Sequence, residues 1–317
     1  MMRVLVTGGQ GCIGAWVIKS LLERGVETVM FDTQAEPVRL SLIAPDLVAR
    51  VRLKTGRIED TEAVKSLIRD EGVTHIVHLA AVLMPFCQAN PVAGGMINVI
   101  GTLNLFEGAR ESGRDVRIVY ASSSAVWGPS EAYENRSLSE ADTPMPATHY
   151  GVFKHANEGN ARVFFATNGI SSIGLRPWTV YGVGRDSGLT ADPTLALRAV
   201  AQGEKFQIRL TGDMDLQYVE DVAEIFLRCL FSPVTGAHVF NLAGEIVAMD
   251  NFIRAVERIQ PASAGLLTAS GPQVPVSSRM DDTGLRTTVG EMPRTPLDEG
   301  IRRTLDGFRA LKAAGKL

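Results

Sequence analysis

Two side chains with acid–base potential stand four residues apart in the segment HYGVFK (149–154). Residues i and i+4 of a helix lie on one face, so Tyr150 and Lys154 are expected to face the same side. A free phenol has a pKa of about 10, too high for a base at neutral pH, and a nearby ammonium lowers that pKa. Tyr150 would then take a proton from a substrate hydroxyl or return one to a carbonyl.

Three consecutive serines, Ser122 to Ser124, end the run VRIVYASSS (116–124), which predicts a strand. The carboxyl ends of strands in doubly wound sheets face the ligand crevice. A serine there can hydrogen-bond the reacting oxygen and hold it near Tyr150. The structural alternative is a hydroxyl-rich strand end that caps the next element.

The N-terminal segment TGGQGCIG (7–14) places Gly8, Gly11 and Gly14 three residues apart. It follows an apolar run of strand length and opens a stretch with helical spacing. Glycines at such a junction let the phosphates of a ligand approach the free N–H groups of the helix. The context predicts a dinucleotide site.

Asp32 closes the second predicted strand, TVMFD (28–32). A carboxylate at this place accepts hydrogen bonds from both hydroxyls of an adenosine ribose and repels a 2′-phosphate. The nearby basic residue is Arg39, seven positions further on. The sequence therefore favours NAD over NADP.

Strands and helices alternate through the first half of the chain. The predicted strands span 3–7, 28–32, 74–81, 116–124 and 171–177, and the predicted helices span 13–25, 59–72, 96–113 and 149–169. Alternation of this kind predicts an α/β fold with a doubly wound parallel sheet of the Rossmann type. We expect residues 1–176 to form the NAD-binding domain.

The pattern changes after Pro177, where we expect a smaller C-terminal substrate lobe over 177–317, with some return of the chain to the sheet. A loop at 182–194 precedes a helix at 192–203, with Asp192 as its N-cap and Pro193 at its first position. Further helices are predicted near 221–231, 249–259 and 297–313, short strands near 206–210 and 238–242, and an irregular loop over 261–278.

Composition narrows the class of protein. The 317 residues are 45% hydrophobic and 21% charged, as in a globular domain, and a net charge of −3 offers no basic surface to nucleic acid or an anionic membrane. The sparse cysteines, the lack of an export signal and the lack of an apolar run of about 18 residues favour a cytoplasmic location. The histidines show no metal-binding spacing.

Taken together, the chain resembles an extended short-chain dehydrogenase/reductase of the NAD-dependent epimerase/dehydratase family. The matching segments are TGGQGCIG, Asp32, HLAA (78–81), NVIGT (98–102), SSSAVWG (122–128), YGVFK (150–154), LRPWTVYG (175–182) and YVEDVA (218–223). The resemblance implies a catalytic triad of Ser123, Tyr150 and Lys154.

The resemblance also implies a set of cofactor contacts to NAD, to which Tyr150 and Lys154 contribute. The others are Gly8, Gly11, Cys12, Ile13, Gly14, Asp32, Ile58, Leu79, Ala80, Ala81 and Asn98. The family usually dimerises through helices that here would be 96–112 and 149–167, so a homodimer is expected.

Three departures from the family pattern bear on the reaction. The acidic pair of the dehydratases is replaced by Ser124 and Ala125, which disfavours dehydration, and Ala125 also disfavours decarboxylation. The arginine that clamps a nucleotide diphosphate is replaced by Met214. A second candidate, Arg279, lies directly beside Asp281. Because a diphosphate without cationic partners is costly to desolvate, the substrate is expected to lack a nucleotide.

Five residues are candidates for substrate contacts: Met84, Ser124, Trp178, Arg185 and Thr190. The guanidinium of Arg185 is suited to a carboxylate or phosphate. The alternative is a solvent-exposed arginine paired with Asp186.

These observations favour an NAD-dependent dehydrogenase of a small polyhydroxylated substrate, such as a sugar, sugar acid or polyol. An epimerase of sugars or nucleotide sugars with tightly held NAD is the second hypothesis. A non-catalytic NAD-sensing regulator is the third, and the intact Ser123, Tyr150 and Lys154 argue against it.

Overall fold

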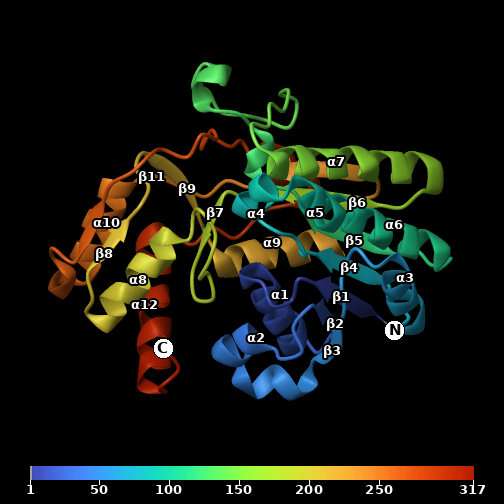
Figure 1. Cartoon of the computed structure of the whole chain (residues 1–317), viewed down its shortest axis with the longest axis horizontal. Coiled ribbons are helices and arrows are strands. Elements are labelled where there is room, and N and C mark those ends of the chain that lie inside the picture. The colour runs from blue at the N-terminus through green and yellow to red at the C-terminus, as the bar shows by residue number, and fades with distance from the viewer. Residues whose placement is uncertain (1) are drawn as a thin grey trace.

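A seven-stranded, wholly parallel sheet forms the centre of the molecule in the computed structural model, which describes residues 2–317 (Figure 1). Its strands are β1 (Arg3–Thr7), β2 (Glu27–Asp32), β3 (Arg52–Thr55), β4 (His75–His78), β5 (Arg117–Ala121), β6 (Ser172–Arg176) and β10 (Ala237–Asn241). The strand order is β10-β6-β5-β4-β1-β2-β3. It reverses between β1 and β4, the place where doubly wound sheets bind ligands, and the predicted fold class is confirmed.

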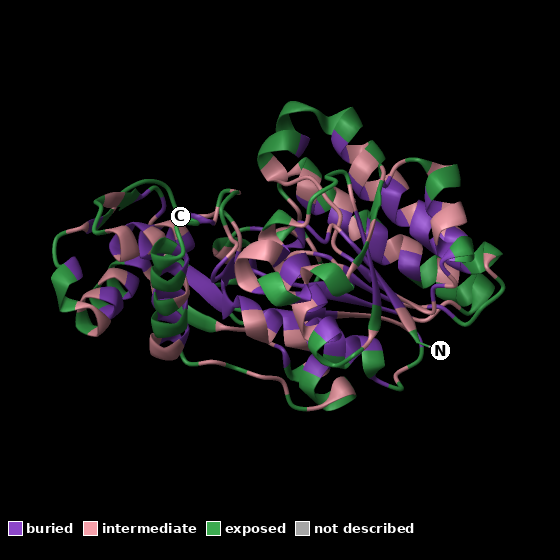
Figure 2. Ribbon diagram, turned by 90° about the horizontal axis from the view of Figure 1, so that it is seen from below, coloured by how far each residue is buried: buried purple, intermediate pink, exposed green. Residues whose placement is uncertain are grey.

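Helices cover both faces of this sheet (Figure 1). On one face lie α1 (Cys12–Glu23), α2 (Val38–Ile43) and α9 (Val219–Phe231), and on the other lie α3 (Thr61–Asp70), α6 (Gly101–Glu111) and α7 (His149–Asn168). Successive strand residues point to opposite faces, so in β1 Val4 and Val6 join the core beside α1, whereas Leu5 joins the core beside α3. Figure 2 shows the resulting buried centre.

The helix predicted at 96–113 begins earlier and is irregular. After α4 (Met84–Ala89), the chain re-enters helix at α5 (Pro91–Gly95), passes through a π-helical turn at Met96–Ile100 and continues as α6. Pro91 suits the first turn of a helix because its missing N–H has no intrahelical partner there. The apolar spacing after residue 96 gave no sign of this earlier start.

The second lobe combines small sheets with peripheral helices. One sheet holds β7 (Thr179–Tyr181), β9 (Asp213–Tyr218) and β11 (Glu245–Ala248), and another pairs β8 (Phe206–Ile208) with β12 (Leu267–Ala269). Its helices are α8 (Asp192–Gln202), α10 (Met249–Ile259), α11 (Thr283–Val289) and α12 (Leu297–Ala313). Of these elements, β7, β9, β11, β12 and α11 had not been predicted.

The strand expected near 238–242 is β10, which pairs with β6 at the edge of the main sheet and provides the expected return of the chain to that sheet. One local prediction was wrong. Asp192 does not cap α8: Ala191 holds that position, and the Asp192 carboxylate accepts the backbone N–H of Arg209 at 2.7 Å and pairs with its guanidinium at 2.6 Å. The tertiary partner outcompetes the local cap, because a buried carboxylate needs a cation.

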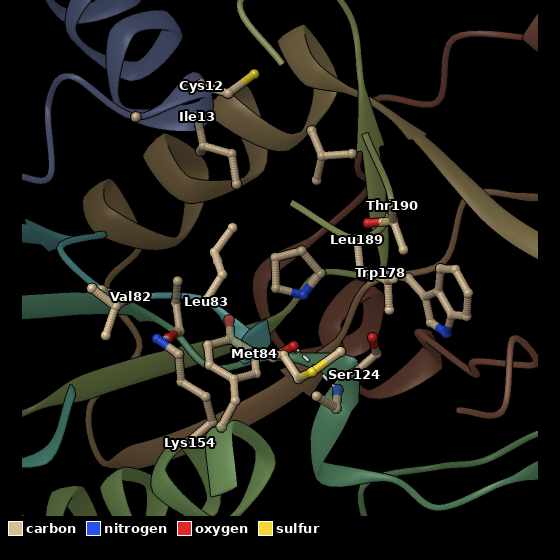
Figure 3. A pocket seen from close by; sticks show the side chains of 18 of the residues that line it. Cys12, Ile13, Val82, Leu83, Met84, Ser124, Lys154, Trp178, Leu189 and Thr190 are labelled. Carbon is tan, nitrogen blue, oxygen red and sulfur yellow. Dashed lines mark hydrogen bonds between the residues drawn. The ribbon is translucent and has the colours of Figure 1, made fainter. Parts of the chain in front are cut away.

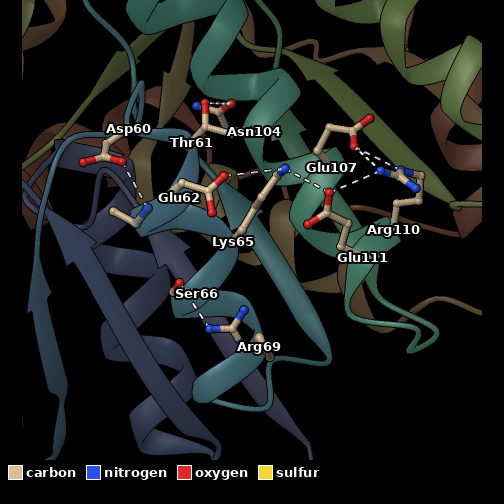
Figure 4. A network of polar contacts seen from close by, with 11 residues as sticks. Asp60, Thr61, Glu62, Lys65, Ser66, Arg69, Asn104, Glu107, Arg110 and Glu111 are labelled. Carbon is tan, nitrogen blue, oxygen red and sulfur yellow. Dashed lines mark hydrogen bonds and ion pairs between the residues drawn. The ribbon is translucent and has the colours of Figure 1, made fainter.

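The outer surface of α3 and α6 carries a chain of ion pairs (Figure 4). Lys65 pairs with Glu111 at 2.9 Å, and Arg110 pairs with Glu107 at 2.6 Å. Exposed pairs contribute little to stability. Beneath these ion pairs the two helices pack closely, because Gly108 of α6 has no side chain and Ile68 of α3 can lie against it.

A buried polar network holds strand β9 in place next to Trp178. The Asp215 carboxylate accepts the backbone N–H of Gly244 at 2.7 Å and a side-chain N–H of Gln217 at 3.2 Å. Gln217 in turn accepts the backbone N–H of Trp178 at 3.1 Å. Burial raises the pKa of Asp215 to about 7.

This raised pKa predicts a pH-dependent stability. The unfolded chain releases the Asp215 proton near pH 4 and the folded chain only near pH 7, so folding becomes less favourable as pH rises through this window. At 1.4 kcal/mol per pKa unit, the loss is about 4 kcal/mol at most. Asp215→Asn removes this loss, because the amide oxygen still faces the Gly244 N–H and carries no charge.

Urea unfolding of the wild type and Asp215→Asn at pH 5 and pH 8 measures the effect. We expect the free energy of unfolding of the wild type to fall more steeply between the two pH values than that of the variant. Parallel pH dependence in the two proteins would show that Asp215 is ionised in the fold at both pH values.

Candidate active site

The junction of β1 and α1 is packed so tightly that only glycine fits. Gly8 has φ +69°, and a Cβ built on it would lie 2.5 Å from the backbone nitrogen of Ala80. A Cβ on Gly14 would overlap the carbonyl oxygen of Gly8, and one on Gly11 would lie 3.0 Å from the same atom. The backbone therefore forms a cradle at the start of α1, as a dinucleotide phosphate requires.

The acid predicted to hold the adenosine ribose stands at the carboxyl end of β2. The Asp32 carboxylate accepts the backbone N–H of Gln10 at 2.9 Å and that of Thr33 at 2.8 Å, which fixes it beside the glycine cradle. The nearby Arg39 donates to the carbonyl oxygens of Gln10 and Gly184 and pairs with Asp186. Its guanidinium is thus already engaged, which fits NAD better than a 2′-phosphorylated cofactor.

Tyr150 reaches the end of β5 because α7 begins in close contact with it. Thr148 caps the helix by accepting the backbone N–H of Gly151 at 3.1 Å. A Cβ on Gly151 would overlap the carbonyl oxygen of Ala125, so a side chain there would push the helix away. The close approach brings Tyr150 to the cavity that Ser123 also lines.

Lys154 lies one turn further along the same face. Its Nζ lies 5.6 Å from the ring centroid of Tyr150 and donates to the carbonyl oxygen of Ala121 at 2.7 Å. The side chain is buried, and burial lowers the pKa of Lys154 to about 8. As their spacing predicted, Tyr150 and Lys154 lie on one face of the helix, and this face packs against the end of β5.

The pKa of Tyr150 is raised in the fold, whereas the pairing with Lys154 predicted that it would be lowered. Burial raises the pKa of Tyr150, and the two influences that lower it are the hydrogen bond with Ser123 and the charge of Arg185. The prediction considered only the helical neighbour, whereas desolvation depends on everything that surrounds the phenol.

A cavity of about 540 Å³ opens between the glycine cradle and the second lobe (Figure 3). Cys12 and Ile13 line it at the start of α1, and Lys154 lines it from α7. Trp178 and Thr190 form another wall. The cavity thus joins the glycine cradle to Ser123, Tyr150 and Lys154, the predicted catalytic residues.

Most of the predicted site residues line this cavity. They are Gly8, Gly11, Cys12, Ile13, Gly14, Leu79, Ala81, Met84, Ser123, Ser124, Tyr150, Lys154, Trp178, Arg185 and Thr190. Asp32, Ile58, Ala80 and Asn98 do not line it. Asp32 and Ala80 support the cradle described above, and Ile58 packs beneath Gly101 of α6.

Asn98 does not line the cavity but supports one of its walls. Its side chain exchanges two hydrogen bonds of 2.9 Å with the backbone of Val82 and donates to the sulfur of Cys87 at 3.2 Å. It is 1% exposed, and its polar atoms are turned to the loop before α4. Asn98 therefore positions the cavity wall at 82–84.

Arg185 is not paired with its neighbour Asp186. Asp186 pairs with Arg39, and Arg185 donates from Nη2 to the hydroxyl of Thr190 at 3.3 Å. Its Nε is buried and has no hydrogen-bond partner within residues 2–317. The alternative of a solvent-exposed pair with Asp186 is therefore wrong.

Neither of the two positions that the resemblance assigns to a diphosphate clamp brings an arginine to this cavity. Met214 is fully buried in the core, and Arg279 is exposed and does not line the cavity. Arg176 is buried nearby, and it forms an ion pair with Glu158 at 2.7 Å.

Sequence reasoning missed a layer of residues behind and across the site. Ser122 donates to the buried Glu158, which ties the end of β5 to α7. The segment 274–276 reaches the cavity from the irregular loop, which is anchored where Trp178 donates to the carbonyl oxygen of Ser277 at 2.7 Å. No periodic pattern marks a coil segment that folds back from a hundred residues away.

Two absences apply to the described part of the chain. Within residues 2–317, no group of three histidine, cysteine or acidic side chains is arranged to hold a metal ion. No helix in this range is both long and apolar enough to cross a membrane.

A doubly wound sheet with a cofactor-sized cavity at its switch point defines the class, that of NAD-dependent enzymes. A model described as the NAD dependent epimerase/dehydratase family matches residues 4–243. The chain belongs to this family, as the motifs predicted.

Known relatives include sugar-nucleotide epimerases. UDP-glucuronate 4-epimerase 4 of Arabidopsis thaliana is 32% identical over 95% of this chain and 74% of its own length. UDP-glucose 4-epimerase of Mycolicibacterium smegmatis is 27% identical over 97% of this chain and 99% of its own.

Solved structures with the same fold include enzymes with different names. The UDP-glucose 4-epimerase of Thermus thermophilus in complex with NAD is 29% identical, with a TM-score of 0.82 over 97% of this chain and 99% of its own. A consensus L-threonine 3-dehydrogenase is 20% identical, with a TM-score of 0.84 over 97% of this chain and 99% of its own, a likeness of fold alone. The fold by itself does not choose between epimerase and dehydrogenase.

The contact between Gly151 and Ala125 predicts a strong effect of a small substitution. Gly151→Ala forces α7 away from β5, which should cost about 1–3 kcal/mol of stability. The matched control is Gly159→Ala in the same helix, where the nearest atom to a new Cβ is 3.8 Å away, at the end of the Arg162 side chain. That change should stabilise by about 0.5–1 kcal/mol, as alanine does in a helix.

Urea unfolding of both variants checks this contrast. Equal shifts of the same sign would mean that α7 does not depend on the glycine at 151.

Proposed function

We propose that the protein is an NAD-dependent oxidoreductase that transfers a hydride at a carbinol carbon of a small polyhydroxylated substrate. The observation that carries this proposal is that Ser123, Tyr150 and Lys154 line the same cavity, with Nζ of Lys154 5.6 Å from the ring centroid of Tyr150 on the same helix face. This arrangement suits removal of a proton from a hydroxyl as the hydride leaves the same carbon.

The residues of the site divide the work as follows. Ser123 hydrogen-bonds the reacting oxygen, and Tyr150 removes its proton. Lys154, whose Nζ lies 5.6 Å from the ring centroid of Tyr150, would hold the ribose of the nicotinamide. NAD⁺ supplies the hydride acceptor when bound, and the cradle of Gly8, Gly11 and Gly14 would hold its pyrophosphate.

The walls of the cavity support a substrate without a nucleotide. Leu83, Met84, Val274 and Val276 line it with apolar surface, and a buried Met214 replaces the diphosphate clamp. A diphosphate would bring at least two negative charges to a site with little to neutralise them. A sugar, sugar acid or polyol fits this chemistry better.

An epimerase is the alternative, because relatives of this chain are UDP-sugar 4-epimerases. In that reaction the hydride returns to the opposite face of the carbon, so no net NADH forms. Cofactor released only on denaturation of the purified protein would favour the epimerase, and cofactor lost on dialysis would favour the dehydrogenase.

The role of Tyr150 is tested by Tyr150→Phe. The phenyl ring fills the same space without the acid–base group, so net NADH formation should fall by about 10²- to 10⁴-fold. Absorbance at the NADH band measures the rate over a panel of sugars, sugar acids and polyols.

Titration of NADH fluorescence provides the control, since the variant should bind cofactor as the wild type does. Undiminished turnover in Tyr150→Phe would overturn the assignment of the base.

We also propose a homodimer, formed through the face of α5, α6 and α7 that Figure 1 shows outside the sheet. Large apolar side chains are exposed there, with Val92 at 81%, Val163 at 60%, Val152 at 47% and Met96 at 45%. Exposed apolar surface of this kind is typical of an interface. A second copy of the chain would bury it by the same face.

Val163→Lys tests the dimer by placing a charge in the proposed interface. Light scattering after size exclusion should give twice 34.2 kDa for the wild type and 34.2 kDa for the variant. Val38→Lys is the control, because Val38 is similarly exposed, at 50%, but lies on α2. A monomeric wild type would contradict the proposal.

Two further assignments belong to the proposal. The boundary between an NAD-binding domain at 1–176 and a substrate lobe at 177–317 is supported by the position of the cavity between them. A cytoplasmic location is supported by Cys12, Cys87 and Cys229, which are free thiols and suit a reducing compartment.

A further inference from the structure

We infer that the substrate carries a carboxylate and that Arg185, with its guanidinium held by Thr190, binds this carboxylate. The inference rests on the proposed hydride transfer and narrows its substrate to a short-chain polyhydroxy acid. It goes beyond the proposed function, which leaves sugars, sugar acids and polyols open.

The first support is the unsatisfied state of Arg185. Its Nε is buried without a partner, and its Nη2 has only the hydroxyl of Thr190 at 3.3 Å. Arg185 is half-buried, and its guanidinium has no anionic partner within residues 2–317. A planar carboxylate in the cavity would pair with such a guanidinium through two parallel hydrogen bonds.

The second support comes from the other charged groups of the cavity, all of which have partners. Lys154 donates to the carbonyl oxygen of Ala121 at 2.7 Å. Arg39 is held by Asp186 and by two backbone carbonyl oxygens. Asp186 therefore does not pair with Arg185, its neighbour in sequence. Among the residues that line the cavity, Arg185 is the cation left for a ligand.

The third support is the loop that holds the guanidinium in place. Gly188 has φ +100°, and a Cβ there would lie 3.1 Å from Nη2 of Arg185 and 2.9 Å from a methyl carbon of Leu83. The loop therefore folds closely over the arginine and presses it toward an apolar wall. This fixed geometry suits recognition better than a mobile surface arginine would.

The position of the charge limits the length of the substrate. Arg185 and Tyr150 line the same cavity of about 540 Å³. A carboxylate on Arg185 would therefore share this enclosed space with the hydroxyl that faces Tyr150. One guanidinium matches one carboxylate, whereas a diphosphate would need further cations, and Met214 offers none.

Calorimetry on the NADH-loaded protein tests the inference with pairs of equal carbon number. Aldonates of three to six carbons are compared with the matching alditols, from glycerate and glycerol to gluconate and sorbitol. We expect at least one aldonate to bind about 100-fold more tightly than its alditol, as charged hydrogen bonds allow. No preference in any pair would overturn the inference.

Arg185→Gln should weaken binding of that aldonate by about 100-fold and leave the alditol unchanged. Arg198→Gln is the control, since this half-buried arginine of α8 does not line the cavity. Equal loss for acid and alditol would assign Arg185 a structural role. Binding of UDP that disappears in Arg185→Gln would identify a diphosphate ligand and also overturn the inference.

Oxidation assays separate this inference from the proposed function. An alditol oxidised in a Tyr150-dependent way, with no preference for acids, would overturn the carboxylate and leave hydride transfer intact. An aldonate bound through Arg185 but oxidised equally well by Tyr150→Phe would support the carboxylate and overturn the mechanism.

Discussion

The close approach of α7 to the end of β5 is the contact on which the site depends. Gly151 lies against the carbonyl of Ala125, Lys154 donates to Ala121, and Glu158 accepts from Ser122. These three contacts occur at successive turns of one helix, so they fix its rotation as well as its distance. Each strand-end serine then has a defined position relative to the phenol of Tyr150, and the proposed acid–base chemistry rests on that geometry.

The second lobe forms one wall of the cavity, and this wall carries charged residues of its own. Its strand β9 is held by Asp215 and Gln217, which leads to Trp178 at the cavity. Its loop is tied to the cofactor side by Arg39 and Asp186. The same pairing that closes the two halves together leaves Arg185 without an acidic neighbour. The contact between the two lobes and the proposed anion recognition by Arg185 thus depend on neighbouring residues of one loop.

The motifs predicted the sheet, the glycine cradle and the residues at the end of β5 because each depends on neighbours in sequence. Predictions failed where a distant partner decided the outcome. Asp192 is a good cap by local rules but pairs with Arg209. The pKa of Tyr150 also went the other way, because its environment comes from several segments.

The sequence by itself determined the family and the NAD cofactor and predicted a catalytic triad, since glycine spacing, Asp32 and the Tyr150–Lys154 pair are local signals. Only the tertiary structure decided which side chains support the site and which face the ligand. Asn98 turned out to hold the loop at Val82, and Arg185 turned out to lack an acidic partner. Such outcomes depend on contacts between segments far apart in the chain, which no spacing within a segment encodes.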